Sequence, residues 1–225
     1  MKIILQLNAL VLVAGLLVSC STTGKQRSAV ELFNGKDLSK WDYVLADAKV
    51  GKDQVWSVRD GILVCKGTPI GALVAGPRVK DFRMVVEYRW APGEKPGNSG
   101  IFSRIEEPLT PLPRAIEVQL QNGNAGDVLG LQGKPVQGGQ ERFFEIKKHA
   151  VAGDISGVRK MSGAEKPPGE WNRVEILAEG GSYTVWVNGK LVNQVNGVDA
   201  TPGRVGVQSE GGVIEFRSIT LTPME

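Results

Sequence analysis

The sequence predicts an all-β domain, and two observations lead to this fold class. Short runs rich in valine and isoleucine are separated by clusters of glycine, proline, asparagine and aspartate. Apolar residues almost nowhere recur at helical spacing, so the periodicity is that of strands. Many short strands with turn signals between them are typical of a β-sandwich of two antiparallel sheets.

The strands can be placed along the chain from the same pattern. Asp60-Gly61 and Asn188-Gly189 each lie between two β-rich runs and favour type I′ hairpins, because both residues tolerate positive φ. The glycine-rich region 122–169 is too long for an ordinary loop, and within it 140–149 is expected to form a short helix or strand. The expected strands are 55–59, 62–66, 71–74, 82–90, 100–104, 115–121, 171–178, 182–187, 190–195, 203–209 and 213–220.

The N-terminus has the features of an export signal. Lys2 is followed by an apolar run from Ile3 to Val18, and the segment Leu17-Val-Ser-Cys20 resembles the end of a bacterial lipoprotein signal. We therefore expect residues 1–19 to be a signal peptide, Cys20 to be lipidated, and the polar stretch 20–28 to be a flexible tether. The alternative is an ordinary signal or a poor anchor helix. The expected location is the bacterial cell envelope, lipid-anchored and facing the periplasm or the outer membrane.

The remaining residues, 29–223, are expected to form one domain. The 27 basic and 24 acidic residues of the chain are interspersed, which gives no electrostatic case for nucleic acid. Once Cys20 is lipidated, Cys65 has no partner for an intramolecular disulfide, and its aliphatic surroundings predict a buried small hydrophobe. No obligate protein partner is evident, and the membrane contact is expected through the lipid anchor alone.

Three alternating segments are predicted to carry one polar face. Their apolar positions alternate with acids, guanidiniums and amides. Antiparallel sheets commonly wet one face, so solvated outer faces are the alternative explanation. Amides and guanidiniums favour a ligand surface, because they offer planar, bidentate hydrogen bonding to sugar hydroxyls and carboxylates. The polar positions are Glu87 and Arg89 in 82–90, Glu117, Gln119 and Gln121 in 115–121, and Arg204 and Gln208 in 203–209.

A set of short motifs, in order along nearly the whole mature chain, resembles the 3-keto-disaccharide hydrolase domain family. The resemblance implies a concanavalin A-like jelly-roll β-sandwich with a carbohydrate groove on its concave sheet. It also implies action on glycosides whose glucose unit is oxidised at C3, by hydrolysis or by elimination followed by hydration. The motifs are Glu31-Leu-Phe-Asn-Gly-Lys-Asp-Leu-Ser-Lys-Trp41, Trp56-Ser-Val-Arg-Asp-Gly61, Asp81-Phe82, Glu87-Tyr-Arg89, Asn98-Ser-Gly-Ile101, Glu117-Val-Gln119, Pro167-Pro-Gly-Glu-Trp-Asn172, Val187-Asn-Gly189, Gly206-Val-Gln208 and Ile214-Glu-Phe-Arg217.

The chemistry of a 3-keto-glycoside assigns roles to these side chains. A ketone at C3 acidifies the proton on C2, so a carboxylate can remove it while a cation holds the enolate and the C1 substituent leaves. We expect Glu117 or Glu87 as the base or metal ligand, with Arg89 and Arg104 holding the enolate. The side chains expected to bind substrate are Arg89, Asn98, Gln119, Gln121 and Gln208.

Several alternatives stay open at the level of sequence. Glu87 and Glu117 could instead be the two carboxylates of an ordinary glycosidase, and Glu87 with Arg89 could be a cross-strand ion pair. No residue spacing predicts a metal site, His149 is the lone histidine, and a divalent metal is neither required nor excluded. The family's aromatic-containing stretch after Glu-Val-Gln is replaced by 128–132, Val-Leu-Gly-Leu-Gln, which leaves substrate choice open. A non-catalytic carbohydrate-binding lipoprotein is the alternative function.

Overall fold

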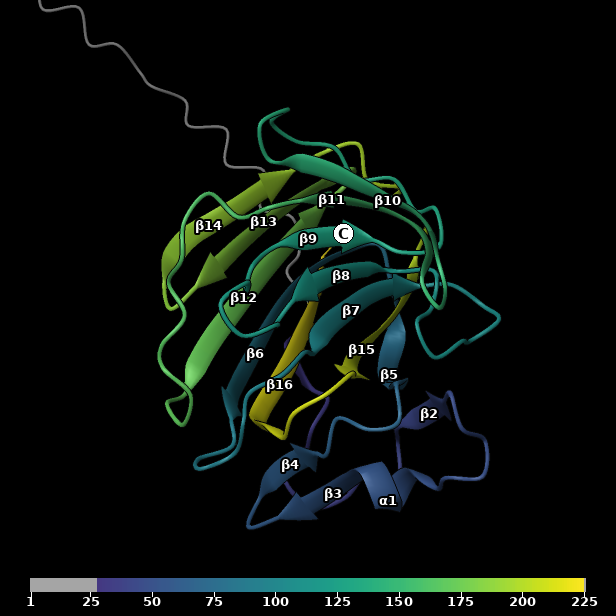
Figure 1. Ribbon diagram of the computed structural model, residues 1–225, viewed down its shortest axis with the longest axis vertical. Coiled ribbons are helices and arrows are strands. Elements are labelled where there is room, and N and C mark those ends of the chain that lie inside the picture. Colours follow the sequence, from purple (N-terminus) through teal and green to yellow (C-terminus); the bar gives the residue numbers. More distant parts are fainter. Residues whose placement is uncertain (1–27, 225) are drawn as a thin grey trace, which may run out of the picture.

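The computed structural model describes residues 28–224, which form two antiparallel β-sheets packed face to face (Figure 1). The expected signal peptide, Cys20 and most of the tether therefore lie outside the described residues. The first sheet, sheet A, has the strand order β14-β13-β12-β6-β16-β4-β3, and β1 also pairs with β16. Its strands are β1 (Val30–Glu31), β3 (Trp56–Arg59), β4 (Ile62–Cys65), β6 (Asp81–Trp90), β12 (Asn172–Glu179), β13 (Ser182–Val187), β14 (Lys190–Val195) and β16 (Ile214–Met224).

The second sheet, sheet B, has the strand order β10-β11-β9-β8-β7-β15-β5-β2. A single turn of helix, α1 (Lys52–Val55), precedes β3, and no helix within residues 28–224 has the length and apolar character needed to cross a membrane. The strands of sheet B are β2 (Asp42–Leu45), β5 (Gly71–Val79), β7 (Gly100–Ile105), β8 (Ile116–Gln119), β9 (Val128–Gly130), β10 (Phe143–His149), β11 (Gly153–Val158) and β15 (Gly203–Ser209). This arrangement confirms the predicted all-β jelly-roll sandwich.

Local sequence signals placed most strands and both hairpins correctly. Asp60 and Gly61 have φ of 50° and 77°, and Asn188 and Gly189 have φ of 51° and 79°. Positive φ at both turn residues is the type I′ geometry that joins β3 to β4 and β13 to β14. The short elements β1, β2 and α1 were not expected.

The core lies between the sheets and follows the predicted alternation. In β6, the side chains of Phe82, Met84, Val86, Tyr88 and Trp90 are all buried in one cluster that receives residues from both sheets. Burial of one such side chain contributes roughly 1.5–3 kcal/mol relative to exposure. The expected burial of Cys65 is confirmed, and burial raises the pKa of its thiol.

The region 122–169 is more ordered than the sequence indicated. It contributes β9, β10 and β11 to sheet B, whereas only a short helix or strand at 140–149 was expected. Glycines at two strand positions interrupt the alternation of residues from which the strands would have been predicted. Each position requires glycine because another group approaches its backbone closely. A Cβ at Gly130 would lie 2.0 Å from the Lys134 carbonyl oxygen, and a Cβ at Gly157 would lie 2.3 Å from the Phe144 ring.

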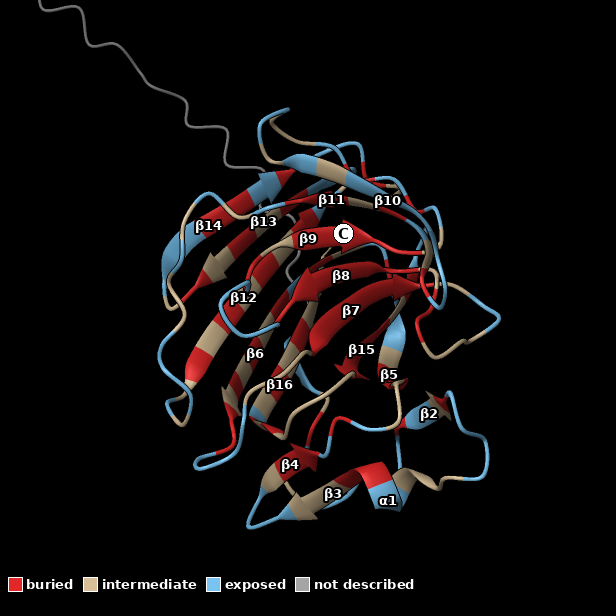
Figure 2. Ribbon diagram, in the orientation of Figure 1, coloured by how far each residue is buried: buried red, intermediate tan, exposed pale blue. Residues whose placement is uncertain are grey.

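The two sheets differ in how their outer faces are covered, as Figure 2 shows. In sheet A, β6 alternates between buried and partly exposed residues, whereas every residue of β7, β8 and β9 in sheet B is buried. A second apolar cluster covers the outer face of sheet B, the face turned away from sheet A, and it includes Phe102, Leu112 and Leu129. The expectation of one shared polar face is therefore wrong: 82–90 lies in sheet A, while 115–121 and 203–209 lie in sheet B.

Candidate functional site

Glu117 is a buried acid on the outer face of sheet B. In the strand register it lies between Phe102 of β7 and Leu129 of β9, so both neighbours on its face are apolar. Its carboxyl group folds over Gly100, where a Cβ would lie 2.2 Å from Glu117 Oε1. Only a glycine at position 100 leaves room for this acid, which is 3% exposed.

The environment of Glu117 favours its protonated form. Burial raises the pKa of this carboxyl well above its ordinary value of 4.5, and the negative charge of Glu210 raises it further. Glu117 Oε1 is buried without a hydrogen-bond partner in the described part of the chain. Burying an acid without a cation beside it costs folding free energy. Such an acid is therefore more readily explained by a role in function than by a role in stability.

Glu210, directly after β15, is the second acid of the site. Its Oε2 accepts a hydrogen bond of 2.8 Å from Asn98 Nδ2. Burial raises its pKa, and the nearby charge of His149 and the amide of Gln208 partly offset that rise. His149 Nδ1 accepts the backbone N–H of Ala152 at 3.0 Å, so the imidazole is fixed by its own turn. The sequence interpretation missed Glu210, although it directly precedes Gly211-Gly212.

Amide side chains complete the polar group. Asn98 Oδ1 and Gln208 Oε1 are buried and, like Glu117 Oε1, have no partner among residues 28–224. Gln119 differs, because its Oε1 accepts the backbone N–H groups of Leu120 and Gln121 at 3.0 and 2.9 Å. The three unpartnered oxygens belong to Glu117, Asn98 and Gln208. They favour a ligand that supplies hydrogen-bond donors, as sugar hydroxyls do.

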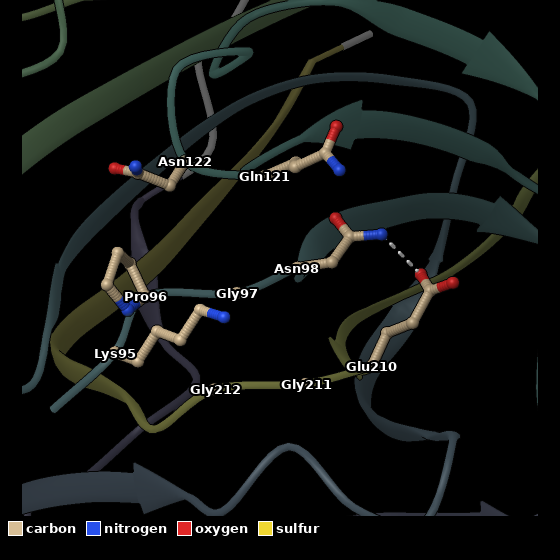
Figure 3. Close-up of a pocket in the computed structure, with 9 residues that line it drawn as sticks. All are labelled: Lys95, Pro96, Gly97, Asn98, Gln121, Asn122, Glu210, Gly211 and Gly212. Carbon is tan, nitrogen blue, oxygen red and sulfur yellow. Dashed lines mark hydrogen bonds between the residues drawn. The ribbon is translucent and has the colours of Figure 1, made fainter.

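A hollow of about 700 Å³ opens beside Glu210 (Figure 3). In the close-up, Asn98 reaches across to Glu210 while Gln121 points along the same side. Glu117 does not line this hollow, but it lies near enough to Glu210 for the charge of that residue to raise its pKa. Two backbone segments of the hollow's lining pass close to each other, since a Cβ at Gly97 would lie 2.2 Å from the Gly211 carbonyl oxygen. The lining residues are Lys95, Pro96, Gly97, Asn98, Gln121, Asn122, Glu210, Gly211 and Gly212.

The wall that carries Gln121 and Asn122 is held from behind by Glu165. Glu165 Oε2 accepts the Gly123 N–H at 2.7 Å, and Lys160 Nζ donates to the Gly123 carbonyl oxygen at 2.5 Å. The other carboxylate oxygen of Glu165 accepts the hydroxyl of the buried Tyr88 at 2.9 Å. An acid and a base thus fix both polar groups of one glycine at the tip of the loop.

Glu87 and Arg89 lie away from this site, on the outer face of sheet A. Arg217 Nε donates to Glu87 Oε2 at 2.8 Å, and Arg89 Nε donates to Glu215 Oε2 at 2.6 Å. Arg89 and Arg217 also stack on the ring of Trp171, at 4.5 and 4.7 Å from its centroid. Glu87 and Arg89 both form cross-strand ion pairs, but each pairs with a residue of β16 and not, as the alternative explanation had it, with the other. Neither side chain meets Glu117.

Arg104 is fully buried at the end of β7 and joins separate segments of the backbone. Its guanidinium donates to the carbonyl oxygens of Lys80, Gly180 and Asp199 at 2.8–3.0 Å. With φ of 49°, the backbone at Arg104 departs from the strand, which turns the side chain away from the position that alternation predicts. Its donors are occupied by the fold, so the structure does not bring Arg104 to the enolate position expected from the sequence.

Metal binding was left open by the sequence. No group of three or more His, Cys, Asp and Glu side chains within residues 28–224 is arranged to hold a metal ion. The oxygens of Glu117, Glu210, Asn98 and Gln208 are nevertheless of the kind that hard divalent cations prefer. Only two of these four side chains are carboxylates, so the described residues do not form a metal site by themselves.

Comparison with known structures shows the same fold in carbohydrate-related proteins. A protein from Parabacteroides distasonis, provisionally described as a glycosyl hydrolase, superposes with a TM-score of 0.62 at 20% identity, over 88% of this chain and 94% of that one. The β-glucanase of Bacillus licheniformis gives 0.57 at 11% identity, over 90% and 100%. The VIP36 exoplasmic/lumenal domain, bound to Ca²⁺ and Man3GlcNAc, gives 0.54 at 11%, over 88% of each chain.

No curated protein matches the sequence. The family model of the 3-keto-alpha-glucoside-1,2-lyase-like domain matches residues 28–222, which is nearly all of the described chain. This agrees with the resemblance found in the short motifs and with the jelly-roll fold. The chain is a carbohydrate-acting protein that belongs to the 3-keto-alpha-glucoside-1,2-lyase-like domain family.

Proposed function

We propose that this protein is an exported enzyme that cleaves glycosides whose glucose unit carries a ketone at C3. The observation that carries the proposal is the pair of acids Glu117 and Glu210, both with raised pKa and with no basic side chain of residues 28–224 bonded to either. Two acids in environments of different polarity are suited to hold and to remove protons at neutral pH. Membership of the family supports the substrate class.

The two acids would take different roles because their burial differs. Glu210 lines the hollow and is the less buried acid, so it ionises first and acts as the base that takes the C2 proton. Glu117 keeps its proton to higher pH and, although it does not line the hollow itself, would be the source of the proton that the oxygen leaving C1 receives. The C2–H and C1–O bonds break, a C1=C2 double bond forms, and addition of water to that bond completes a net hydrolysis. This assignment revises the expectation that Glu117 is the base.

The amides would orient the sugar. The Asn98 and Gln208 oxygens can accept hydroxyl protons, and the wall formed by Gln121 and Asn122 closes one side of the hollow.

A substrate screen tests the proposal. The purified domain is assayed against 3-keto-glucosides and their unoxidised parents, with and without divalent metal, beside Glu210→Gln and Glu117→Gln. Turnover of keto-glycosides by the wild type that falls in both variants supports the enzyme. Binding of glycans with no turnover under any condition would replace it with a carbohydrate-binding lipoprotein.

We also propose that Cys20 anchors the protein to the bacterial envelope after removal of residues 1–19. The motif Leu17-Val-Ser-Cys20 carries this proposal. Cells fed a labelled fatty acid should label the wild-type protein and leave Cys20→Ala unlabelled. Equal labelling of the two proteins would exclude this cysteine as the attachment site.

A further inference from the structure

β10 forms one edge of sheet B. It pairs with β11 on one side, and no strand within residues 28–224 pairs with its other side. The strand is exposed along nearly its whole length, and Phe143 and Ile146 remain 38% and 43% exposed. An open edge of this kind offers backbone groups to another strand unless it is protected.

The backbone groups that face this open edge follow from the pairing with β11. The Arg142 carbonyl accepts the Arg159 N–H, so the even-numbered residues direct their backbone groups toward β11. Glu145 and Lys147 therefore direct their N–H and C=O groups toward the open edge. The register shift after Ile146 limits regular pairing to this short segment.

The side chains of the segment are self-complementary. In an antiparallel pair centred on Ile146, each Glu145 lies opposite a Lys147, and Ile146 lies opposite its own copy. The residues that would be paired are also the ones whose backbone groups face outward. We propose that β10 is an interaction surface for a second copy of this chain, and that the two β10 strands pair antiparallel about a two-fold axis at Ile146.

Charge selects this register over its neighbours. A shift of the partner by two residues in either direction preserves the hydrogen-bond pattern but places Glu145 opposite Glu145, or Lys147 opposite Lys147. Like charges directly opposite one another destabilise an antiparallel pair. A two-fold axis requires an isologous contact, and the central register provides one without a repulsive pair.

Ion pairs that Glu145 and Lys147 form within the monomer do not prevent the pairing of two β10 strands. Lys147 Nζ lies 2.9 Å from Glu145 Oε1 and 3.7 Å from Asp154 Oδ2, and the side chains of all three residues are 48–59% exposed. Exposed ion pairs contribute little to stability, so replacing them with intermolecular pairs costs little. Few residues take part, and the association is therefore expected to be weak and dependent on concentration.

A charge-reversal cycle tests the proposal. Sedimentation equilibrium of the described domain, from about 10 µM to about 1 mM, should show a reversible monomer–dimer equilibrium. Lys147→Glu and Glu145→Lys should each weaken dimerisation by about tenfold or more, because each creates two like-charged pairs. The double variant E145K/K147E should recover nearly wild-type dimerisation. Lys190→Glu, at an exposed position of the edge strand β14 of sheet A, is the matched control and should leave the dimer unchanged.

The outcomes separate the surfaces clearly. A monomer at every concentration would overturn the proposal, as would a dimer that responds to Lys190→Glu and not to Lys147→Glu. A misfolded single variant would show in its thermal melt. In that event the double variant tests the proposal, which is overturned if E145K/K147E folds but does not dimerise. Slower amide exchange at Glu145 and Lys147 as concentration rises is the independent reading expected from backbone pairing.

Discussion

The outer face of each sheet carries a glutamate, and the surroundings of the two glutamates are opposite in kind. On sheet A, Glu87 is paired with Arg217 at 2.8 Å and remains partly exposed. On sheet B, Glu117 is buried, has no ion-pair partner among residues 28–224, and burial raises the pKa of its carboxyl well above the ordinary value. The difference shows that the candidate site is recognised from an acid that the fold buries without an ion-pair partner. The residue type alone does not identify it.

The comparison is tested most severely by replacing one acid on each face. Glu117→Gln keeps the shape of the side chain and removes its proton, so turnover of a 3-keto-glucoside should fall by about 10²–10⁴ while the fold is retained. Glu87→Gln is the matched control on sheet A and should keep wild-type turnover. Steady-state kinetics and thermal melts check both variants. Equal losses in the two variants would remove the distinction between the faces.

A substitution at Arg104 tests whether its guanidinium stabilises the fold or takes part in catalysis. Arg104→Met should lower the free energy of unfolding by about 3–5 kcal/mol, because three backbone carbonyls lose a buried charged donor. Denaturant unfolding measures the loss. If the variant is as stable as the wild type but inactive, Arg104 belongs to the chemistry instead.

The raised pKa of Glu117 also predicts how stability depends on pH. A carboxyl whose pKa is higher in the folded state stabilises the fold below its unfolded value, near 4.5, and this stability is lost as pH rises through the folded pKa. Over that window one such group lowers the free energy of unfolding by about 1.4 kcal/mol per pH unit. Unfolding measured from pH 4 upward (about one unit per step) should show a shallower decline in Glu117→Gln than in the wild type. Identical slopes would mean that Glu117 is not buried as described.

A smaller effect is expected where Glu165 holds the wall of the hollow. Glu165→Ala frees the Gly123 N–H, so hydrogen exchange in the loop 120–127 should rise and sugar affinity should fall by about tenfold. Glu170→Ala, in the same exposed segment, is the control and should match the wild type. Faster exchange with unchanged affinity would show that the wall does not contact the ligand.

The smallest effect belongs to the ion pairs of sheet A. Arg217→Ala removes the partner of the partly exposed Glu87 and one of the two guanidiniums stacked on Trp171. The loss in free energy of unfolding should be about 1 kcal/mol or less, with turnover unchanged. Chemical denaturation is sufficient to detect it, and a loss of several kcal/mol would show that this face is coupled to the core.

Local rules account for what the sequence could predict. The alternation of 82–90 and the two Asn-Gly and Asp-Gly turns depend on neighbouring residues, and the structure agrees with them. Sheet membership depends on pairing between distant strands, so nothing local to Glu87 and Glu117 shows that they lie in different sheets. The strand pattern brought Glu117 and Gln208 into the candidate site, and the structure places both near Glu210. It did not include Glu210, because that residue follows the strand instead of lying within it.

The most direct test is whether ligand reaches the amides of sheet B. Side-chain amide resonances of Asn98 and Gln208 can be followed by NMR as a 3-keto-glucoside is added, with the exposed Gln194 of strand β14 as the internal reference. The account predicts that the Asn98 and Gln208 signals shift together with a single affinity while Gln194 stays fixed. Signals that stay unchanged at saturating sugar, or a shift confined to Gln194, would contradict it.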